Sequence, residues 1–79
     1  MDNKEFLFIQ LYGAMSEFNN SPIKRMGLET ACRPLNIDAD KLRTDLLAFD
    51  CHGDYDEFRK KVDRKFKQIC KSFNVEVNI

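Results

Sequence analysis

The chain has 79 residues, which is enough for one domain, and its 13 basic and 13 acidic residues give a formal net charge of zero. Apolar residues make up 43% and charged residues 33% of the chain, a mixture typical of a globular domain rather than a disordered one. The balanced charge argues against a dedicated nucleic-acid-binding protein, which usually carries a basic excess. Neither a signal peptide nor a membrane-spanning run is indicated, so we expect one cytoplasmic helical domain over residues 1–79.

The first predicted helix begins at Asp2 and runs to Phe18. Asp2 and Glu5 have the spacing of a capping box, in which each side chain satisfies a free amide at the helix start. Beyond them, apolar side chains recur at helical spacing and predict one buried face. They are Leu7, Phe8, Leu11, Ala14, Met15 and Phe18. Residues 6–9 also fit a short buried strand, which is the less favoured alternative.

Phe6, Ile9 and Gly13 lie opposite this buried face, at positions i, i+3 and i+7, and we call them the apolar patch. Two large apolar side chains beside a glycine allow another backbone to approach closely, so one interpretation is a surface for a protein partner or a second copy of the chain. The other interpretation is that this helix is buried on both faces inside its own domain. The pattern favours neither.

The second helix is predicted to begin at Ser21 and Pro22, because serine is a favoured N-cap and proline suits the first helical position. Gly27 is expected to kink or divide this helix. Its end should fall near Arg33, since Pro34 has no amide hydrogen to donate.

The third predicted helix follows Asp38, which is a favoured N-cap. Ile37 and Leu42 have the spacing of a hydrophobic staple across this helix start. The predicted buried face consists of Ala39, Leu42, Leu46 and Phe49.

Residues 28–49 resemble the helix-turn-helix DNA-binding unit in spacing only, over about a quarter of the chain. Cys32 would take the small-residue position, Asn36 the turn and Leu42 the buried position of the second helix. The turn position is usually glycine, however, and Pro34 is awkward inside a first helix. Three aspartates in the second helix would also repel phosphates: Asp38, Asp40 and Asp45. Ordinary helix packing is therefore the favoured interpretation.

The fourth helix has the clearest start, because Asp54 and Glu57 form a second capping box. Its apolar stripe consists of Tyr55, Phe58, Val62, Phe66, Ile69 and Phe73. Burial is predicted for four of these residues: Phe58, Val62, Phe66 and Ile69. Residues 73–79 then alternate between apolar and polar, which is strand periodicity, and a lone strand needs an edge to pair with. The predicted fold class is therefore all-α, a small three- or four-helix bundle with a short extended, strand-like C-terminal tail.

The outer face of the fourth helix carries a row of four cations that we call the basic ridge: Lys60, Arg64, Lys67 and Lys71. At helical spacing they project from one strip opposite the phenylalanines and span about 16 Å. The ridge itself contains no acid, and Asp63 is expected to lie on its flank. Such a row can bind phosphates or an acidic protein surface. The alternative is a solvated outer face with no partner.

No catalytic or metal site is predicted. Three cysteines and one histidine supply the ligand types of zinc: Cys32, Cys51, Cys70 and His52. The chain has no Cys-x-x-Cys pair, so we expect free thiols in a reducing compartment and no metal or other cofactor. His52 has no second catalytic group at a diagnostic spacing, and the three glycines are isolated, which argues against an enzyme.

The sequence therefore favours a non-catalytic regulatory or adaptor domain that binds a protein partner, with inhibition of that partner as one form of regulation. The expected surfaces are the basic ridge and the apolar patch, and a homodimer is one possible use of the patch. The alternative function is nucleic-acid binding, with the ridge following a line of phosphates.

Overall fold

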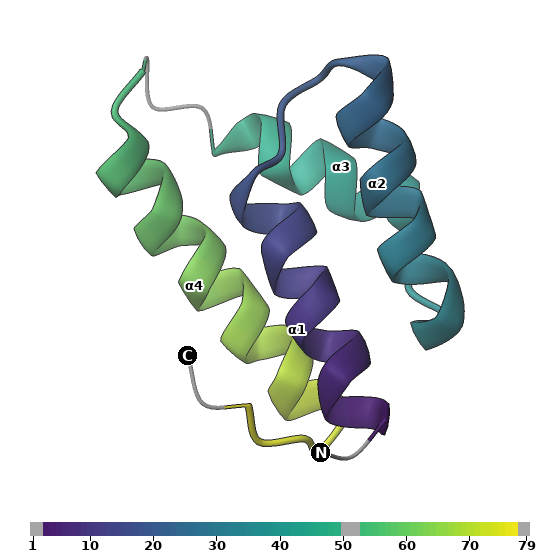
Figure 1. The fold of residues 1–79 in the computed structure, drawn as a ribbon. Coiled ribbons are helices and arrows are strands. Elements are labelled where there is room, and N and C mark those ends of the chain that lie inside the picture. The colour runs from purple at the N-terminus through teal and green to yellow at the C-terminus, as the bar shows by residue number, and fades with distance from the viewer. Residues whose placement is uncertain (1–2, 50–52, 78–79) are drawn as a thin grey trace.

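The computed structural model describes residues 3–49 and 53–77, and within these ranges it contains helices and no strand. The elements are α1 (Asn3–Ser16), α2 (Pro22–Cys32), the short 3₁₀ helix η1 (Arg33–Leu35), α3 (Ala39–Ala48) and α4 (Tyr55–Ser72) (Figure 1). The predicted all-α class is confirmed, with four α-helices. The strand alternative for residues 6–9 is wrong, since these residues lie inside α1.

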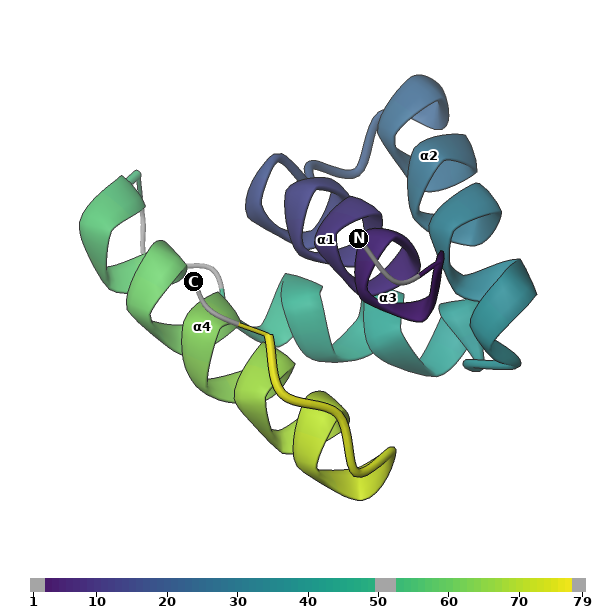
Figure 2. The ribbon, with the colours of Figure 1, turned by 60° about the horizontal axis from the view of Figure 1, so that its bottom comes forward.

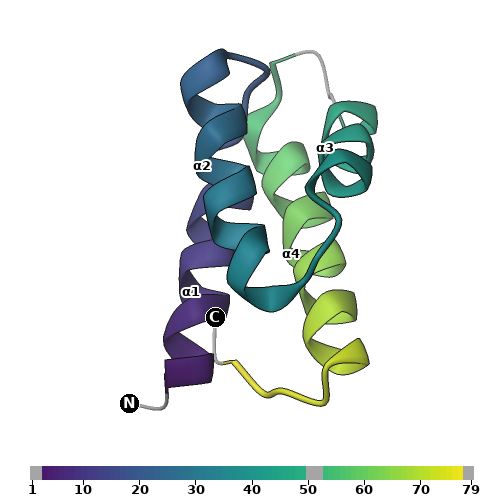
Figure 3. The same ribbon diagram turned by 90° about the vertical axis from the view of Figure 1, so that its right-hand side faces the viewer.

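The helices form a small bundle around α1. Helix α1 contacts α2 on one side and α4 on the other, and α2 also contacts α3. Helices α1 and α4 run in opposite directions along their shared seam, as Figure 1 shows. Figure 2 shows α3 crossing beneath α1, and Figure 3 shows α2 in front of α1. Each helix therefore keeps one face free of the bundle.

All four helices contribute to the core, and its centre is aromatic. Phe8 and Phe66 are fully enclosed, with ring centroids 6.5 Å apart in an edge-to-face arrangement. Phe73, after the end of α4, also packs its ring edge-to-face with that of Phe8, at 5.5 Å. The buried apolar residues are Phe8, Leu11, Met15, Phe18, Leu28, Ala31, Cys32, Leu35, Leu42, Leu46, Val62, Phe66 and Cys70.

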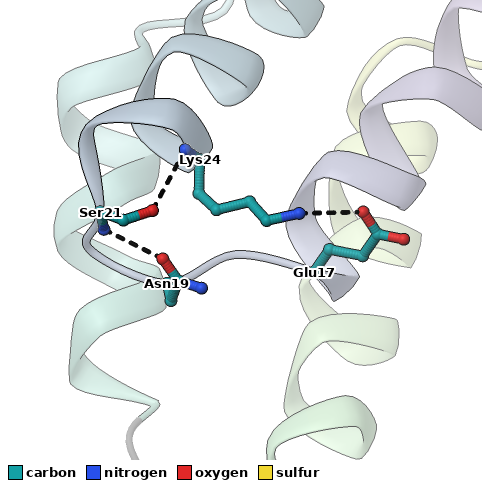
Figure 4. A network of polar contacts seen from close by, with 4 residues as sticks. All are labelled: Glu17, Asn19, Ser21 and Lys24. Carbon is teal, nitrogen blue, oxygen red and sulfur yellow. Dashed lines mark hydrogen bonds and ion pairs between the residues drawn. The ribbon is translucent and has the colours of Figure 1, made fainter.

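The turn between α1 and α2 is held by side chains, as Figure 4 shows. The Ser21 hydroxyl accepts a hydrogen bond from the Lys24 amide at 3.4 Å, and the Asn19 side-chain oxygen accepts one from the Ser21 amide at 3.0 Å. The Lys24 ammonium also pairs with Glu17, at the end of α1, at 3.3 Å. The predicted helix start at Ser21 and Pro22 is confirmed.

The starts of α3 and α4 are also confirmed. The Asp38 carboxylate accepts hydrogen bonds from the amides of Asp40 and Lys41, and the Asp54 carboxylate accepts one from the Glu57 amide. These bonds satisfy amides that have no partner within the first helical turn. The capping box predicted at Asp2 lies outside the described residues.

Two helix ends use the same device, an asparagine in the left-handed conformation. Asn36 and Asn74 both have φ near 57°, one after η1 and one after α4. In each case the next amide returns to a helix carbonyl five residues earlier, from Ile37 to Cys32 and from Val75 to Cys70. This pattern is the Schellman motif, which ends a helix by satisfying its last carbonyls.

The structure corrects two expectations about α2 and α4. Helix α2 continues unbroken through Gly27, because Leu28, Ala31 and other residues of its inner face pack into the core. Of the four α4 residues predicted to be buried, Val62 and Phe66 are buried, whereas Phe58 and Ile69 are only partly buried. Tyr55 and Phe73, at the two ends of the same apolar stripe, are 54% and 36% exposed.

The C-terminal tail forms no strand in its described part, residues 73–77, where the left-handed Asn74 turns the chain away from the axis of α4. Val75 and Val77 pack against the core instead. Residues 78 and 79 lie outside the described residues, and pairing of the tail with another chain stays a prediction.

Candidate interaction surface

The basic ridge lies on the outer face of α4, where all four of its side chains are exposed. Arg64, Lys67 and Lys71 form no ion pair with any residue in the described ranges. Lys60 differs, because its ammonium lies 3.5 Å from the Glu57 carboxylate on the same face. The prediction that the ridge contains no acid is therefore wrong at its first turn. An exposed pair of this kind contributes at most about 1 kcal/mol, so Glu57 competes only weakly with an outside partner.

Asp63 lies on the α1 side of the ridge, and α1 satisfies its charge. The Tyr12 hydroxyl donates a hydrogen bond of 2.5 Å to the Asp63 carboxylate. The Arg59 guanidinium donates to the same hydroxyl at 3.5 Å, and this bond raises the pKa of Arg59 above its ordinary value. The Asp63 carboxylate is therefore bonded to α1 and does not pair with the ridge.

The apolar patch is exposed. Phe6 is 50% and Ile9 is 40% exposed, and a side-chain carbon added at Gly13 would meet no atom within 4 Å. The described part of the domain therefore does not enclose these positions, and what covers them stays a prediction.

The ridge and the patch border the same seam. Glu5 of α1 lines one groove with Lys67 and Lys71 of α4, and residues 74–77 of the C-terminal tail, Glu76 among them, line it as well. Farther along the seam, Tyr12 bonds to Asp63. On the surface of α1, Ile9 lies between Glu5 and Tyr12, because residues three and four apart are neighbours on a helix. Ile9 is therefore the patch residue nearest the seam, and Phe6 and Gly13 lie farther out on α1. The ridge and the patch thus lie on the outer faces of two helices that contact each other.

A second exposed apolar area lies on the outer face of α2 and was missed in the sequence analysis. Ile23 and Met26 are 79% and 65% exposed, and Gly27 beside them has open space where a side chain would be. The signal was present, since Ile23 and Met26 are three residues apart and lie opposite the buried Leu28.

The helix-turn-helix spacing has a structural counterpart, because Asn36 adopts the left-handed conformation that glycine usually supplies at such a turn. The outward side of α3 is unsuited to DNA, however. Asp40 is largely exposed and lies 3.7 Å from the Arg43 guanidinium, whose charge it offsets. Asp45 pairs with Lys65 of α4 at 3.0 Å and so joins the two helices.

The described residues contain no group of three His, Cys, Asp or Glu side chains that could hold a metal ion. Cys51 and His52, named above as possible ligands, lie outside those residues. Burial raises the pKa of the Cys32 thiol to about 11 and also raises that of Cys70. Both thiols are therefore protonated near neutral pH, which makes them poor nucleophiles. No helix in the described part of the chain is long and apolar enough to cross a membrane.

No family model, curated protein or solved structure matches this chain. The function is therefore argued from the surface itself.

Proposed function

We propose that this chain is a non-catalytic regulatory or adaptor domain that binds an acidic surface of a protein partner through the basic ridge and the apolar patch. The observation that carries the proposal is the placement of Arg64, Lys67 and Lys71. These three exposed cations have no ion-pair partner in the described residues, and their helix contacts α1, whose outer face carries the exposed Phe6 and Ile9.

The two parts of this surface have different physical roles. Burial of exposed apolar area supplies affinity, at about 25 cal/mol per Å² before the cost of association. The row of cations steers an acidic partner toward the seam and fixes its orientation. A surface that combines both is more typical of a protein-binding site than of a phosphate track, in which apolar side chains contribute little.

Nucleic-acid binding is the second candidate, and the left-handed turn at Asn36 is the observation that favours it. Exposed acids on α3 count against DNA recognition by that helix. A ridge that binds DNA phosphates would show a slope of about −0.9 per phosphate in log affinity against log salt, or about −3 to −4 for four cations. Docking that depends on Phe6 and Ile9 would show a much weaker salt dependence.

The test compares two double charge reversals in the full-length chain, each captured from lysate of the source cell with and without nuclease. We expect Arg64→Glu with Lys67→Glu to lose bound proteins, and Lys41→Glu with Arg43→Glu on α3 to retain them, in both cases irrespective of nuclease. Circular dichroism should show that both variants keep their helices. Loss of all partners after nuclease would establish the second candidate instead, and loss in the α3 variant would point to the helix-turn-helix.

A further inference from the structure

We propose that the groove between α3 and α4 binds a phosphate monoester. The groove has a volume of about 410 Å³ and lies beside the ion pair between Asp45 and Lys65. Its described lining consists of Asp45, Phe49, Lys61, Arg64, Lys65 and Gln68. This site goes beyond the proposed function, since Lys61 and Lys65 do not belong to the basic ridge and Arg64 is the one residue that both surfaces use.

Three cations of α4 line this groove within little more than one helical turn. Arg64 and Lys65 lie three and four residues after Lys61, so all three side chains project from one side of the helix. The Lys61 and Lys65 side chains are partly buried, and Arg64 is exposed. Like charges at these spacings weaken a helix. A bound anion would offset that repulsion, and a concave, partly buried surface strengthens its attraction.

The charge left in the groove matches a phosphate monoester better than a carboxylate. Asp45 pairs with Lys65 at 3.0 Å, whereas Lys61 and Arg64 have no ion-pair partner among the described residues. The described lining therefore keeps two net positive charges. A phosphate monoester carries a charge of about −1.5 to −2 at pH 7, while a carboxylate carries a single negative charge and would leave one cation uncompensated.

The side chains that line the groove also offer suitable donors. The planar guanidinium of Arg64 makes two parallel hydrogen bonds to a phosphate, and the ammonium groups of Lys61 and Lys65 donate as compact charges. The Gln68 amide adds two neutral donors. A phosphate monoester presents three strong acceptor oxygens, so one group can accept from several of these side chains at once.

The groove between α1 and α4 differs in charge. Lys67 and Lys71 line it together with Glu5 and Glu76, so these four side chains carry no net charge. An anion in that groove would meet two carboxylates, whereas the groove between α3 and α4 has one carboxylate among its described residues, already paired with Lys65. We therefore expect a small anion to bind between α3 and α4.

The experiment titrates the isotopically labelled full-length chain with three probes. Two are short peptides of the same uncharged sequence, with phosphoserine at the centre of one and glutamate at the centre of the other. The third is a single phosphoserine residue with both ends blocked. Amide chemical shifts, recorded at a constant ionic strength of about 0.1 M, give the dissociation constant and the place of binding. We expect the phosphoserine peptide to bind about tenfold more tightly than the glutamate peptide, because only the dianion compensates both net charges.

Two matched substitutions locate the contact. Lys61→Gln removes one positive charge from the groove, and Arg25→Gln removes one from α2, which does not line it. Glutamine is a good helix former, so both variants should fold, as circular dichroism can check. We expect Lys61→Gln to weaken binding of the phosphoserine peptide about tenfold, since a hydrogen bond to a charged group is lost, and Arg25→Gln to leave it unchanged.

Three results would overturn the inference. The phosphoserine peptide would fail to bind, it would bind no more tightly than the glutamate peptide, or Lys61→Gln and Arg25→Gln would have equal effects. Equal affinities of the phosphoserine peptide and the single phosphoserine residue would support a free phosphate monoester as the ligand. Tighter binding of the peptide would instead support a phosphorylated protein segment.

The same variant separates this inference from the proposed function. Lys61 lies outside the basic ridge, so Lys61→Gln should keep the captured protein partners that the double reversal at Arg64 and Lys67 loses. That result would support the proposed function even if no phosphate probe bound to the groove. Phosphate binding that depends on Lys61, with no partner lost in the double reversal, would support this inference and overturn the proposed function.

Discussion

The outer faces of α1 and α2 carry the same kind of residues and have different neighbours. Each presents two exposed apolar side chains beside a glycine with open space over it, Phe6 and Ile9 with Gly13 on α1, and Ile23 and Met26 with Gly27 on α2. Helix α1 contacts α4, which carries the basic ridge, whereas α2 packs against α1 and α3. Exposed apolar area alone does not specify a partner, and the neighbouring charge is what allows one to be proposed for α1.

The largest effect on stability is expected for Phe66→Ala, which removes a core side chain beneath α1. Phe66 is 1% exposed and packs against both Phe8 and Tyr12, so its loss leaves a cavity under the seam. We expect a decrease of about 3–5 kcal/mol in the free energy of unfolding, enough to threaten a small domain. Urea denaturation measures it, with Met26→Ala on the exposed α2 face as the control, expected within about 0.5 kcal/mol of the wild type. An unchanged Phe66→Ala midpoint would contradict the described packing of α4.

Tyr12→Phe should have a smaller effect on the same seam. The substitution leaves the half-buried Asp63 carboxylate without its 2.5 Å hydrogen bond. Loss of a bond to a charged group is expected to decrease the free energy of unfolding by about 1–3 kcal/mol. Thermal unfolding monitored by circular dichroism provides the measurement. The matched control is Tyr55→Phe, at an exposed tyrosine, and an equal effect of the two variants would show that the bond does not stabilise the seam.

The left-handed asparagines allow a test of the helix ends that frame the two faces. Asn36→Ala should decrease stability by about 1 kcal/mol, because a side chain with a Cβ and no polar group disfavours positive φ. Asn36→Gly should leave stability unchanged or increase it. The same pair of substitutions at Asn74 should give the same order. If alanine and glycine proved equivalent at either position, the left-handed conformation there would be contradicted.

The smallest expected effect on stability compares the glycines of the two outer faces directly. Gly13→Ala and Gly27→Ala should each increase the free energy of unfolding by about 0.4–1 kcal/mol, since both positions are helical and a Cβ meets nothing within 4 Å. Differential scanning calorimetry would record two similar increases in the melting temperature. A decrease for either variant would mean that the space over that glycine is filled, for instance by a second copy of the chain.

The parts of the fold that were predicted from sequence depend on local chemistry. Ser21, Asp38 and Asp54 begin helices because each side chain bonds to amides two or three residues away, and such bonds need no knowledge of the rest of the chain. Helical periodicity likewise identified the inner faces of α1 and α3. Gly27 was misjudged because the core contacts of its neighbours outweigh its weak helix propensity.

The predictions that failed depend on how far the neighbouring helices extend along α4. Tyr55 and Phe73 continue the apolar spacing of α4, and no local pattern reveals that the neighbouring helices no longer cover them fully. The same holds for the candidate site. Helical spacing predicted that the four ridge cations share one strip, but the sequence could not show that this strip lies beside α1. The bond between Tyr12 and Asp63 and the groove that Glu5 shares with Lys67 and Lys71 show it.

The bond between Tyr12 and Asp63 should also affect the intrinsic fluorescence of the protein. The chain has two tyrosines and no tryptophan, so emission excited beyond the phenylalanine absorption band comes from Tyr12 in the seam and from the exposed Tyr55. A phenol that donates a hydrogen bond to a carboxylate emits weakly, which leaves Tyr55 as the brighter reference. Opening of the seam should release Tyr12 and brighten the spectrum, so tyrosine emission can follow separation of α1 from α4 without any attached dye.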